Sequence, residues 1–497
     1  MSRPAAFAAL FALIVLYFSG VAGVGLIGPD EPRYASVGHE MARSGDWVTP
    51  RLWGEPWFEK PALLYWMIGG AFRLGWDENW APRLPVAVFS LCFLAGYFFL
   101  VRREFGAEIA WWATAILSTS ALWMAFSHAA VTDLPLAAAF TGALLLIVRE
   151  ADERKGSRAA AGALLGLSVL AKGLVPLILF LPVLWFTRKR WRSWFEPGFW
   201  IAFALIALPW YVLCTMQNGS TFLDVFFLQH QLGRFASDAL QHVQPIWFYV
   251  PVLLGALLPW TFFLPLALFP ISMGREIYAD RRMKLLAAIV IFGFVFFSAS
   301  RNKLPGYLLP LIPSIAILLA AGIRNTRLSR PKPLALVTAG SALLLPLFPL
   351  AASLLPQAFS GTGDIFPVDP VTAGNVSLAV PVAVIAGAAT LALSRTRALV
   401  LLASLFVCAW FYLERATFPS LDRTASARSL WVEIPEPKSD TCVAGTLHRS
   451  WRYGLNYYAG KLLPDCSTSP AQNRIEPGST PRSRPVISRA GGAVTLE

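Results

Sequence analysis

About thirteen apolar stretches, most of them close to the length of a membrane-spanning helix, divide most of this 497-residue chain. They lie at roughly 5–27, 82–101, 109–127, 134–149, 159–172, 173–187, 199–217, 247–271, 285–300, 304–322, 333–355, 374–393 and 397–412. Residues 159–187 also admit other divisions. Because lipid leaves backbone polar groups to be satisfied within helices or closed barrels, the pattern predicts an all-α polytopic membrane protein.

The composition is typical of the same class. Hydrophobic residues make up 56% of the chain and charged residues 14%, against about 25% charged in soluble domains. The net charge of +13 is compatible with nucleic-acid binding, but the lysines and arginines form short clusters between apolar stretches and no single basic face. We therefore expect no nucleic-acid partner. Residues 5–27 exceed the apolar core of a signal peptide, so we expect them to remain as a first helix.

The loops between the apolar stretches alternate in charge. One set carries clusters of lysine and arginine, at 102–103, 149–158, 188–192, 275–284, 324–332 and 395–397. The other set is poorer in these residues and lies at 28–81, 128–133, 218–246, 301–303 and 356–373. The positive-inside rule assigns the first set to the cytoplasm. The N-terminus is therefore expected inside, and the second set and the C-terminus are expected outside.

Two parts of the chain differ from the apolar stretches. In the first loop (residues 28–81), residues 61–76 are apolar but short for a span and predict an interfacial helix, and 218–246 predicts another. After residue 412 the composition becomes polar, with a strand-like run at 441–447 and a helix-like run at 449–460. We expect a transmembrane domain at 1–412 and a small outward-facing α/β domain at 413–497. Its cysteines, Cys442 and Cys466, are expected to pair in an oxidising compartment.

Three polar clusters fall on loops of the outward-facing set. Asp30 and Glu31 follow the first apolar stretch directly, Glu59 and Lys60 lie in FEKP, and Asp133 lies in TDLPL. Ionisable residues at the mouths of apolar helices indicate a site. Asp30 alone is also explained as a helix cap, but capping does not explain three clusters on one face. The three aspartate and glutamate residues Asp30, Glu31 and Asp133 are our candidate catalytic groups.

Several side chains on this face are candidate donors to a phosphate. Lys60 precedes a proline and an apolar helix, a setting that suits a lipid-linked phosphate through charge-assisted hydrogen bonds. The alternative is that Lys60 only snorkels to the interface. Further candidate substrate-binding residues are Tyr34, Arg234, Lys303 and Tyr307. A transporter can carry the same residues, but would more often hold them near the membrane midplane.

The sequence gives weak evidence for a metal site and no motif for several other classes of protein. Glu59 and His230 are possible metal ligands, but two ligands so far apart in sequence predict little by themselves. No glycine-rich phosphate loop, Ser-His-Asp order or HExxH motif occurs, which argues against a nucleotide-driven pump, a serine hydrolase and a zinc protease. We therefore expect no nucleotide cofactor.

The segment PDEPRYASVGHEMARSGDWVTPRLWGEPWFEKPALLYW, followed by APRLPVAVFS and TDLPL, closely resembles the ArnT-like branch of the GT-C membrane glycosyltransferases. This branch includes the aminoarabinose transferases of lipid A and is related to the protein O-mannosyltransferases. The resemblance covers about residues 5–320 and gives no match for the C-terminal domain. It implies a GT-C fold in the bacterial inner membrane and inverting transfer, at the periplasmic face, of a sugar carried on undecaprenyl phosphate. The implied acceptor is lipid A or lipopolysaccharide.

The resemblance also implies roles for particular residues. Asp30 and Asp133 correspond to the acids of the two outer loops, and Lys60 corresponds to a phosphate-binding lysine. Glu59 and His230 correspond to a pair that holds a divalent metal, which would be zinc. The chain departs from the family pattern after Lys60, where a single proline stands in place of two.

Sugar transfer from a polyprenyl phosphate requires cations that stabilise the leaving phosphate, which Lys60 and Arg234 can supply. Asp30 can orient the acceptor or take its proton if the acceptor is a hydroxyl. A phosphate acceptor is already ionised, and then Asp30 and Asp133 would instead hold the sugar. Two other functions stay open: a protein O-mannosyltransferase-like enzyme, and a lipid flippase or transporter without transfer chemistry.

Overall fold

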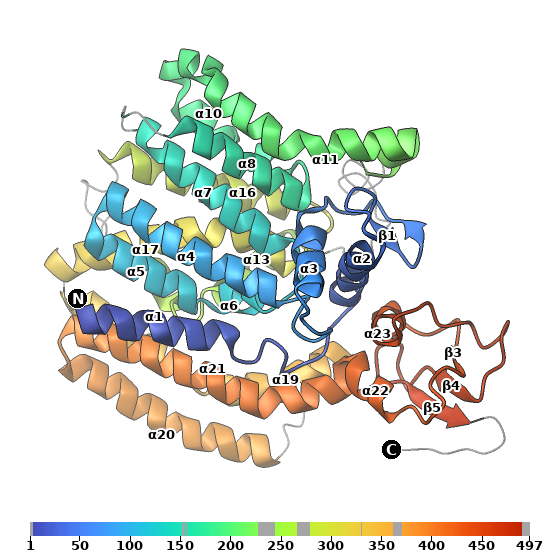
Figure 1. The fold of residues 1–497 in the computed structure, drawn as a ribbon. Coiled ribbons are helices and arrows are strands. Elements are labelled where there is room, and N and C mark those ends of the chain that lie inside the picture. Colours follow the sequence, from blue (N-terminus) through green and yellow to red (C-terminus); the bar gives the residue numbers. More distant parts are fainter. Residues whose placement is uncertain are drawn as a thin grey trace.

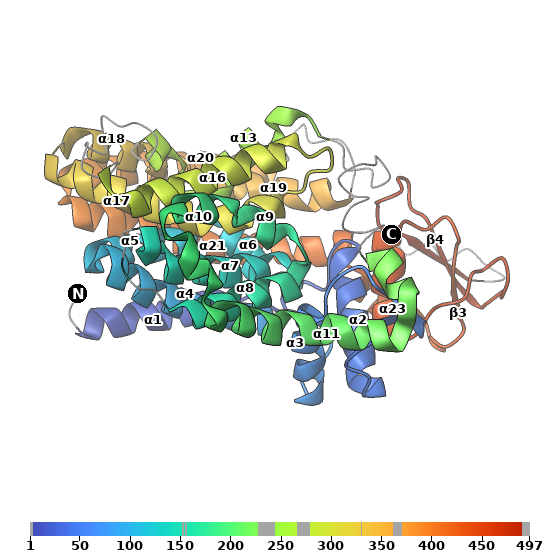
Figure 2. The ribbon, with the colours of Figure 1, turned by 90° about the horizontal axis from the view of Figure 1, so that it is seen from above.

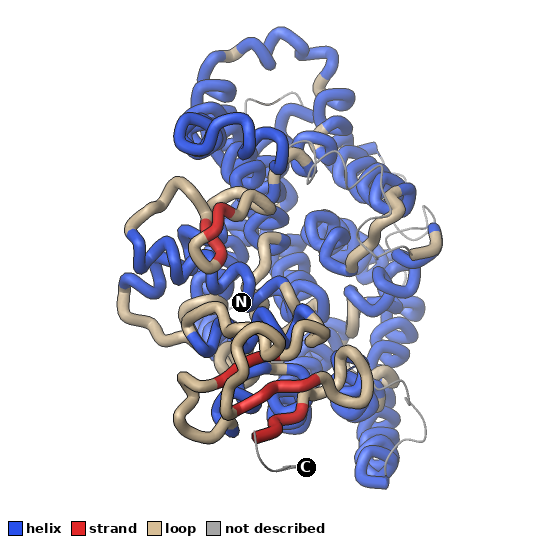
Figure 3. The backbone as a smooth tube through the Cα atoms, turned by 90° about the vertical axis from the view of Figure 1, so that its right-hand side faces the viewer, coloured by secondary structure: helices blue, strands red, loops and turns tan. Residues whose placement is uncertain are grey.

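The computed structural model describes residues 3–151, 154, 157–226, 244–265, 279–329, 331–360 and 370–489. Long helices run side by side and form the body of the molecule (Figure 1). Two short helices of the first loop and a small sheet gather at one end of this bundle, opposite the end where the chain begins (Figures 1 and 2). Viewed toward that end, the strands and their loops lie in front of the helices (Figure 3).

Within the described ranges, six helices are long and apolar enough to cross a membrane, or up to eight if each bent pair is one span. The six are α4 (Leu84–Phe105), α11 (Pro197–Leu223), α16 (Arg281–Ala299), α17 (Ile312–Ser329) with the preceding η5 (Pro305–Leu311), α20 (Pro370–Ala392) and α21 (Arg395–Ala425). The bent pairs are α5 (Ala107–Thr119) with α6 (Ala121–Ser127), at 63°, and α18 (Pro331–Ala342) with α19 (Leu347–Ser360), at 49°.

The other helices of the bundle are α1 (Arg3–Phe18), α7 (Asp133–Ala151), α8 (Arg158–Lys172), α9 (Val175–Leu179), α10 (Leu181–Phe186), η1 (Arg188–Phe195), η3 (Ile246–Phe248), α13 (Tyr249–Ala256) and η4 (Thr261–Phe263). A multi-pass helical fold is confirmed, whereas the count of about thirteen crossings is not. The first predicted span, 5–27, is helical only to Phe18, and Gly20 soon afterwards adopts a left-handed φ of 66°. A Cβ at Gly20 would lie 2.7 Å from the Phe418 ring.

The first loop contains α2 (Asp30–Ser44), the short antiparallel pair β1 (Arg51–Leu52) and β2 (Glu55–Pro56), and α3 (Leu63–Arg73). Figure 1 shows α2 and α3 crossing the direction of the long helices. The predicted helix at 61–76 is therefore observed as the shorter α3, with Leu64, Tyr65 and Ile68 fully buried. The predicted helix at 218–246 lies mostly outside the described residues.

The C-terminal unit (residues 427–489) contains α22 (Ala427–Glu433), β3 (Thr441–Val443), α23 (Arg449–Ala459), β4 (Asn473–Glu476) and β5 (Val486–Arg489). The sheet order is β3-β4-β5, with β3 parallel to β4 and β4 antiparallel to β5, and α23 makes the crossover that a parallel pair requires. The predicted disulfide between Cys442 and Cys466 is confirmed. The composition changes at 413, but α21 continues to Ala425, so the end of the helix lies beyond the predicted boundary.

The C-terminal unit packs directly on the first loop and the turn before it. Leu26 and Ala35 share one hydrophobic core with Trp451 and Leu455. Tyr458 adds a hydrogen bond of 3.0 Å by accepting from the backbone N–H of Leu26. The unit is therefore held against the same end of the bundle as α2.

Candidate functional site

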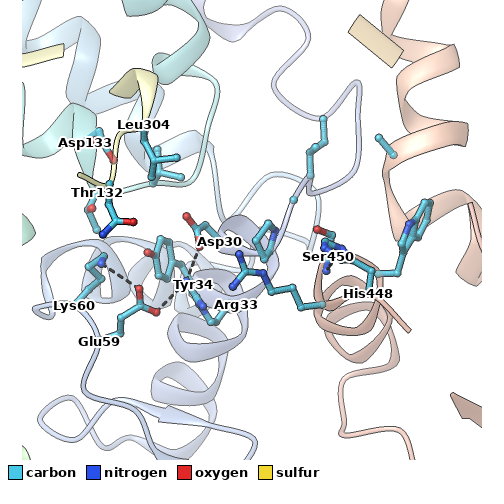
Figure 4. A pocket seen from close by; sticks show the side chains of 18 of the residues that line it. Asp30, Arg33, Tyr34, Glu59, Lys60, Thr132, Asp133, Leu304, His448 and Ser450 are labelled. Atoms are coloured by element: carbon cyan, nitrogen blue, oxygen red, sulfur yellow. Dashed lines mark hydrogen bonds and ion pairs between the residues drawn. The ribbon is translucent and has the colours of Figure 1, made fainter. Parts of the chain in front are cut away.

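A cavity of about 490 Å³, here called the main cavity, lies between the first loop and the C-terminal unit. Most of its described wall comes from the start of α2, residues 57–60, the loop into α7, the stretch around η5, and the residues that begin α23. Lys172, Ala358, Ala425 and Arg482 complete it. Figure 4 shows side chains of α2 and residues 59–60 on one side, with His448 and Ser450 of the C-terminal unit on the other. Residues more than 400 positions apart in sequence therefore face one space.

A chain of four charged side chains crosses the floor of the main cavity. The Lys60 ammonium lies 3.1 Å from Glu59 Oε1, and Arg33 bridges Glu59 Oε2 at 2.9 Å and Asp30 Oδ1 at 2.5 Å (Figure 4). Asp30 and Arg33 are neighbours because they lie three residues apart on α2. Lys60 and Glu59 are only 5% and 4% exposed, and buried charges require such partners.

Burial and charge set the protonation of the neighbouring groups. Burial alone would lower the pKa of Arg33, but the carboxylates of Glu59 and Asp30 raise this pKa above its ordinary value. The pKa values of Tyr34 and Tyr65 are both raised by burial, and Glu59 adds to the rise. Tyr34 lines the main cavity as a neutral phenol, with its ring 5.3 Å from the Arg33 guanidinium carbon.

A second ion pair forms on another wall of the main cavity. The Lys172 ammonium lies 2.5 Å from Asp133 Oδ1 and 5.0 Å from the centre of the Tyr307 ring. Asp133 begins α7, Lys172 ends α8, and Tyr307 lies in η5. Gly306 allows this close packing, since a Cβ there would lie 2.8 Å from Asp133 Oδ1. The predicted residues Asp133 and Tyr307 therefore share the main cavity with Asp30, Tyr34, Glu59 and Lys60.

Lys172 was not among the residues predicted from sequence. It stands in LAKGLVP, at the junction of two adjacent apolar stretches, and the following Gly173 has a left-handed φ of 83°. A lysine at a glycine break between two apolar stretches is the signal that could have identified it. The predicted spans 159–172 and 173–187 adjoin without a loop between them, so Lys172 falls at the end of a predicted span.

Glu31, predicted as a catalytic acid, does not line the main cavity. Arg83 donates to both of its oxygens, at 2.8 and 2.6 Å, and the backbone N–H groups of Ile27 and Ala130 donate at 2.9 and 2.8 Å. Glu31 and Arg83 are 6% and 4% exposed. With both oxygens occupied by donors, Glu31 is a structural link between α2, the start of α4 and the loop before α7.

Lys303, predicted to bind substrate, directs its ammonium to backbone carbonyls and not into the main cavity. Its ammonium donates to the carbonyl of Gln244 at 2.9 Å and to the carbonyl of Ser300. Its neighbours Asn302 and Leu304 line the main cavity, whereas Lys303 does not. It stabilises the loop before η5 and does not present its charge to the cavity.

The remaining predicted residues concern a metal and a second phosphate donor. Arg234 and His230 lie outside the described residues. Glu59 is described, and each of its oxygens already faces a cation, Lys60 or Arg33. Among the described residues, no group of three or more histidine, cysteine, aspartate or glutamate side chains is placed to hold a metal. The described part of the main cavity therefore does not by itself fit a metal ion.

Five described residues of the C-terminal unit line the main cavity and were not predicted as site residues. They are His448, Arg449, Ser450, Trp451 and Arg482, which face the first loop across the cavity. Nothing in a polar segment at the end of a chain marks such residues, because their position depends on how the unit packs on α2. Their contribution is visible only in the folded molecule.

Comparison with known proteins agrees with this architecture. Residues 59–214 match the protein family described as dolichyl-phosphate-mannose-protein mannosyltransferase. A relative in Edwardsiella ictaluri, named undecaprenyl phosphate-alpha-4-amino-4-deoxy-L-arabinose arabinosyl transferase, is 33% identical over 65% of this chain and 60% of its own length. A relative with the same name in Serratia proteamaculans is 32% identical over 71% of this chain and 67% of its own length. The chain thus spans about three fifths to two thirds of these relatives.

Two crystal structures share the fold. ArnT from Cupriavidus metallidurans bound to undecaprenyl phosphate has a TM-score of 0.72 at 22% identity, with 94% of this chain and 91% of that chain covered. The same protein in the apo state has a TM-score of 0.71 at 24% identity, with 94% and 90% covered. With the Serratia relative more than 30% identical over 67% of its length, this multi-pass membrane protein belongs to the ArnT-like family of GT-C glycosyltransferases.

Proposed function

We propose that this chain is a glycosyltransferase that moves a sugar from undecaprenyl phosphate to lipid A or lipopolysaccharide, with inversion, at the periplasmic face of a bacterial inner membrane. The names of the relatives support the donor, and a Cupriavidus neighbour of the same fold is bound to undecaprenyl phosphate. The observation that carries the proposal is the main cavity, in which buried Lys60 and the acids Asp30 and Asp133 face one space.

The proposed orientation places the main cavity outside and the N-terminus in the cytoplasm. Arg83, which contacts the first loop, lies directly before α4, and the 22 residues of this helix extend about 33 Å. At its far end, Arg103 and Arg149 lie 3.5 and 3.3 Å from Glu104. These arginines belong to loops of the basic set, which supports a cytoplasmic location for that end. The C-terminal unit would then be periplasmic, and about thirteen crossings remain our prediction.

In the proposed reaction, the donor phosphate binds beside Lys60. A lysine ammonium has three donors, so Lys60 can contact Glu59 and a phosphate at the same time. As the bond between the sugar and the phosphate breaks, negative charge grows on the phosphate, and a cation already in place stabilises it without reorganisation. The described residues supply this charge through Lys60 and Arg33.

The acids have separate tasks in this proposal. The Asp30 side chain is 44% exposed and is the carboxylate more open to a substrate, whereas that of Asp133 is 15% exposed beside Lys172. Asp30 would take the proton of a hydroxyl acceptor, or orient the sugar if the acceptor is an ionised phosphate. Asp133, with Lys172, would hold a polar group of the sugar.

A protein O-mannosyltransferase-like activity is the second candidate, favoured by the family match over residues 59–214. A flippase is less well supported, because the described charged groups of the main cavity gather at one end of the bundle, and transporters more often keep such groups near the midplane. Mass spectrometry of lipid A and of envelope proteins, from cells with and without the chain, separates these functions. We expect lipid A to gain one sugar; glycosylated proteins with unchanged lipid A would support the second candidate.

We further propose that Glu59 and His230 bind zinc, a pairing that rests on the family resemblance because His230 lies outside the described residues. Metal analysis of purified wild-type and His230→Ala protein is expected to show metal in the first and a loss of it in the second. Equal and near-zero content in both would refute the pairing. No step of the reaction proposed above passes through a metal.

A further inference from the structure

The charges of the described residues that line the main cavity do not balance. Its three carboxylates, those of Asp30, Glu59 and Asp133, each lie within 3.1 Å of a cation that also lines the cavity. Those three cations are Arg33, Lys60 and Lys172. Two further arginines, Arg449 and Arg482, line the same cavity. Among the lining residues that the structure describes, five cations against three carboxylates leave two positive charges, with histidine counted as neutral.

The two surplus charges both come from the C-terminal unit. The side chains of Arg449 and Arg482 are exposed, and neither forms an ion pair or a hydrogen bond with another side chain within the described ranges. Arg482 contributes only its backbone carbonyl, which accepts from the Trp451 indole at 3.0 Å. Both guanidinium groups therefore keep their donors for a ligand.

His448 and Ser450 complete this wall of the cavity. Burial, together with Arg482 and Arg449, lowers the pKa of His448, so its ring is neutral near pH 7. His448 Nδ1 accepts from the backbone N–H of Ser450 at 3.3 Å, which leaves Nε2 as the ring N–H donor. The wall thus offers donors, and its five described residues, which include Trp451, contain no carboxylate.

This wall lies opposite the proposed donor site. In Figure 4, Lys60 and Glu59 lie on one side of the cavity, His448 and Ser450 lie on the other, and Asp30 is between them. A transferase must hold two substrates on either side of the group that is transferred. If the donor phosphate binds beside Lys60, the wall of the C-terminal unit faces the acceptor.

We infer that Arg449 and Arg482 bind a phosphate monoester of the acceptor and so select an anionic glycolipid over a neutral hydroxyl. This inference rests on the proposed function. A phosphate monoester carries about −1.5 to −2 charges at pH 7, which matches the two unbalanced positive charges. Arginine also presents a planar fork that binds phosphate through two hydrogen bonds. A protein hydroxyl would leave both guanidinium groups without a counter-charge.

The test compares the full-length double variant Arg449→Ala/Arg482→Ala with wild type and with Arg474→Ala. Arg474 is a matched control, because it is an exposed arginine of the same unit, 3.8 Å from Glu476, and does not line the main cavity. With donor and lipid A varied separately, we expect the double variant to raise KM for lipid A at least tenfold, the scale of one lost charge-assisted hydrogen bond. The KM of the double variant for the donor should stay within about twofold of wild type, and so should both KM values of Arg474→Ala. A twofold change is smaller than the change expected from the loss of one charge-assisted hydrogen bond.

Equilibrium binding to protein in lipid nanodiscs provides a second readout that does not need turnover. Lipid A should bind the double variant at least tenfold more weakly, undecaprenyl phosphate should bind it as it binds wild type, and Arg449→Lys/Arg482→Lys should recover part of the loss. Unchanged lipid A binding in a folded double variant would overturn the inference, and loss of undecaprenyl phosphate binding would assign the arginines to the donor. Failure of wild type to transfer sugar would instead count against the proposed function.

Discussion

Replacing Arg83 with alanine is expected to destabilise the protein by about 3–5 kcal/mol, the cost of leaving one member of a buried ion pair without its partner. Arg83 is 4% exposed and donates to both oxygens of Glu31. It also donates to the carbonyls of Val24 and Gly25, at 2.5 and 3.0 Å. Its loss would leave the Glu31 carboxylate and these carbonyls without a charged donor and release the first loop from α4.

The unfolding midpoint in nanodiscs, measured for Arg83→Ala against wild type, checks this expectation. Arg51→Ala is the matched control, because the pair of Arg51 with Asp46 is 3.8 Å long and about one third exposed. Such exposed pairs contribute about 0–1 kcal/mol. A shift for Arg83→Ala no larger than that of the control would show that the link with Glu31 does not hold the first loop.

Replacing Lys60 with alanine is expected to lower transfer roughly 10- to 100-fold at limiting donor. The Lys60 ammonium is buried at the floor of the main cavity, and its loss removes a charge-assisted hydrogen bond from the leaving phosphate. Lys60→Arg should recover only part of the activity, because a planar fork does not replace a compact ammonium. Initial rates at several donor concentrations measure the effect.

The control for this comparison is Lys284→Ala. Lys284 is an exposed lysine near the start of α16, away from the main cavity, and its loss should leave the rate unchanged. Each variant must give the same yield and the same monodisperse elution, since a misfolded protein would imitate a loss of activity. If well-folded Lys60→Ala turns over donor like wild type, Lys60 only snorkels and the phosphate binds elsewhere.

Several residues that line the main cavity could be predicted from the sequence, because their loops are expected on the same side of the membrane. Asp30, Lys60, Asp133 and Tyr307 all line the main cavity, as expected for residues on loops that share one side of a membrane. Glu31 does not line the cavity, because the sidedness of a loop does not distinguish neighbouring residues on a helix. Successive residues of α2 point about 100° apart, so Asp30 faces the cavity and Glu31 faces Arg83.

The parts that could not be predicted depend on packing between distant segments. Arg449 and Arg482 reach the main cavity because the C-terminal unit shares a core with Leu26 and Ala35, a contact that no local pattern indicates. Helix breaks were missed for a related reason. The apolar stretch at 109–127 is continuous in sequence, but the chain turns at Ser120, whose backbone is extended between α5 and α6. Apolar composition predicts burial in lipid and not the straightness of a helix.

Sugar transfer by the purified chain in liposomes tests the central claim most directly. The liposomes would contain a sugar-carrying undecaprenyl phosphate and lipid A, and the products would be analysed by mass spectrometry and by the anomeric configuration of the transferred sugar. We predict sugar on lipid A with inverted configuration, one undecaprenyl phosphate released for each sugar, and a reduced rate with Lys60→Ala. Movement of the intact donor across the bilayer, with no sugar on lipid A, would contradict the account.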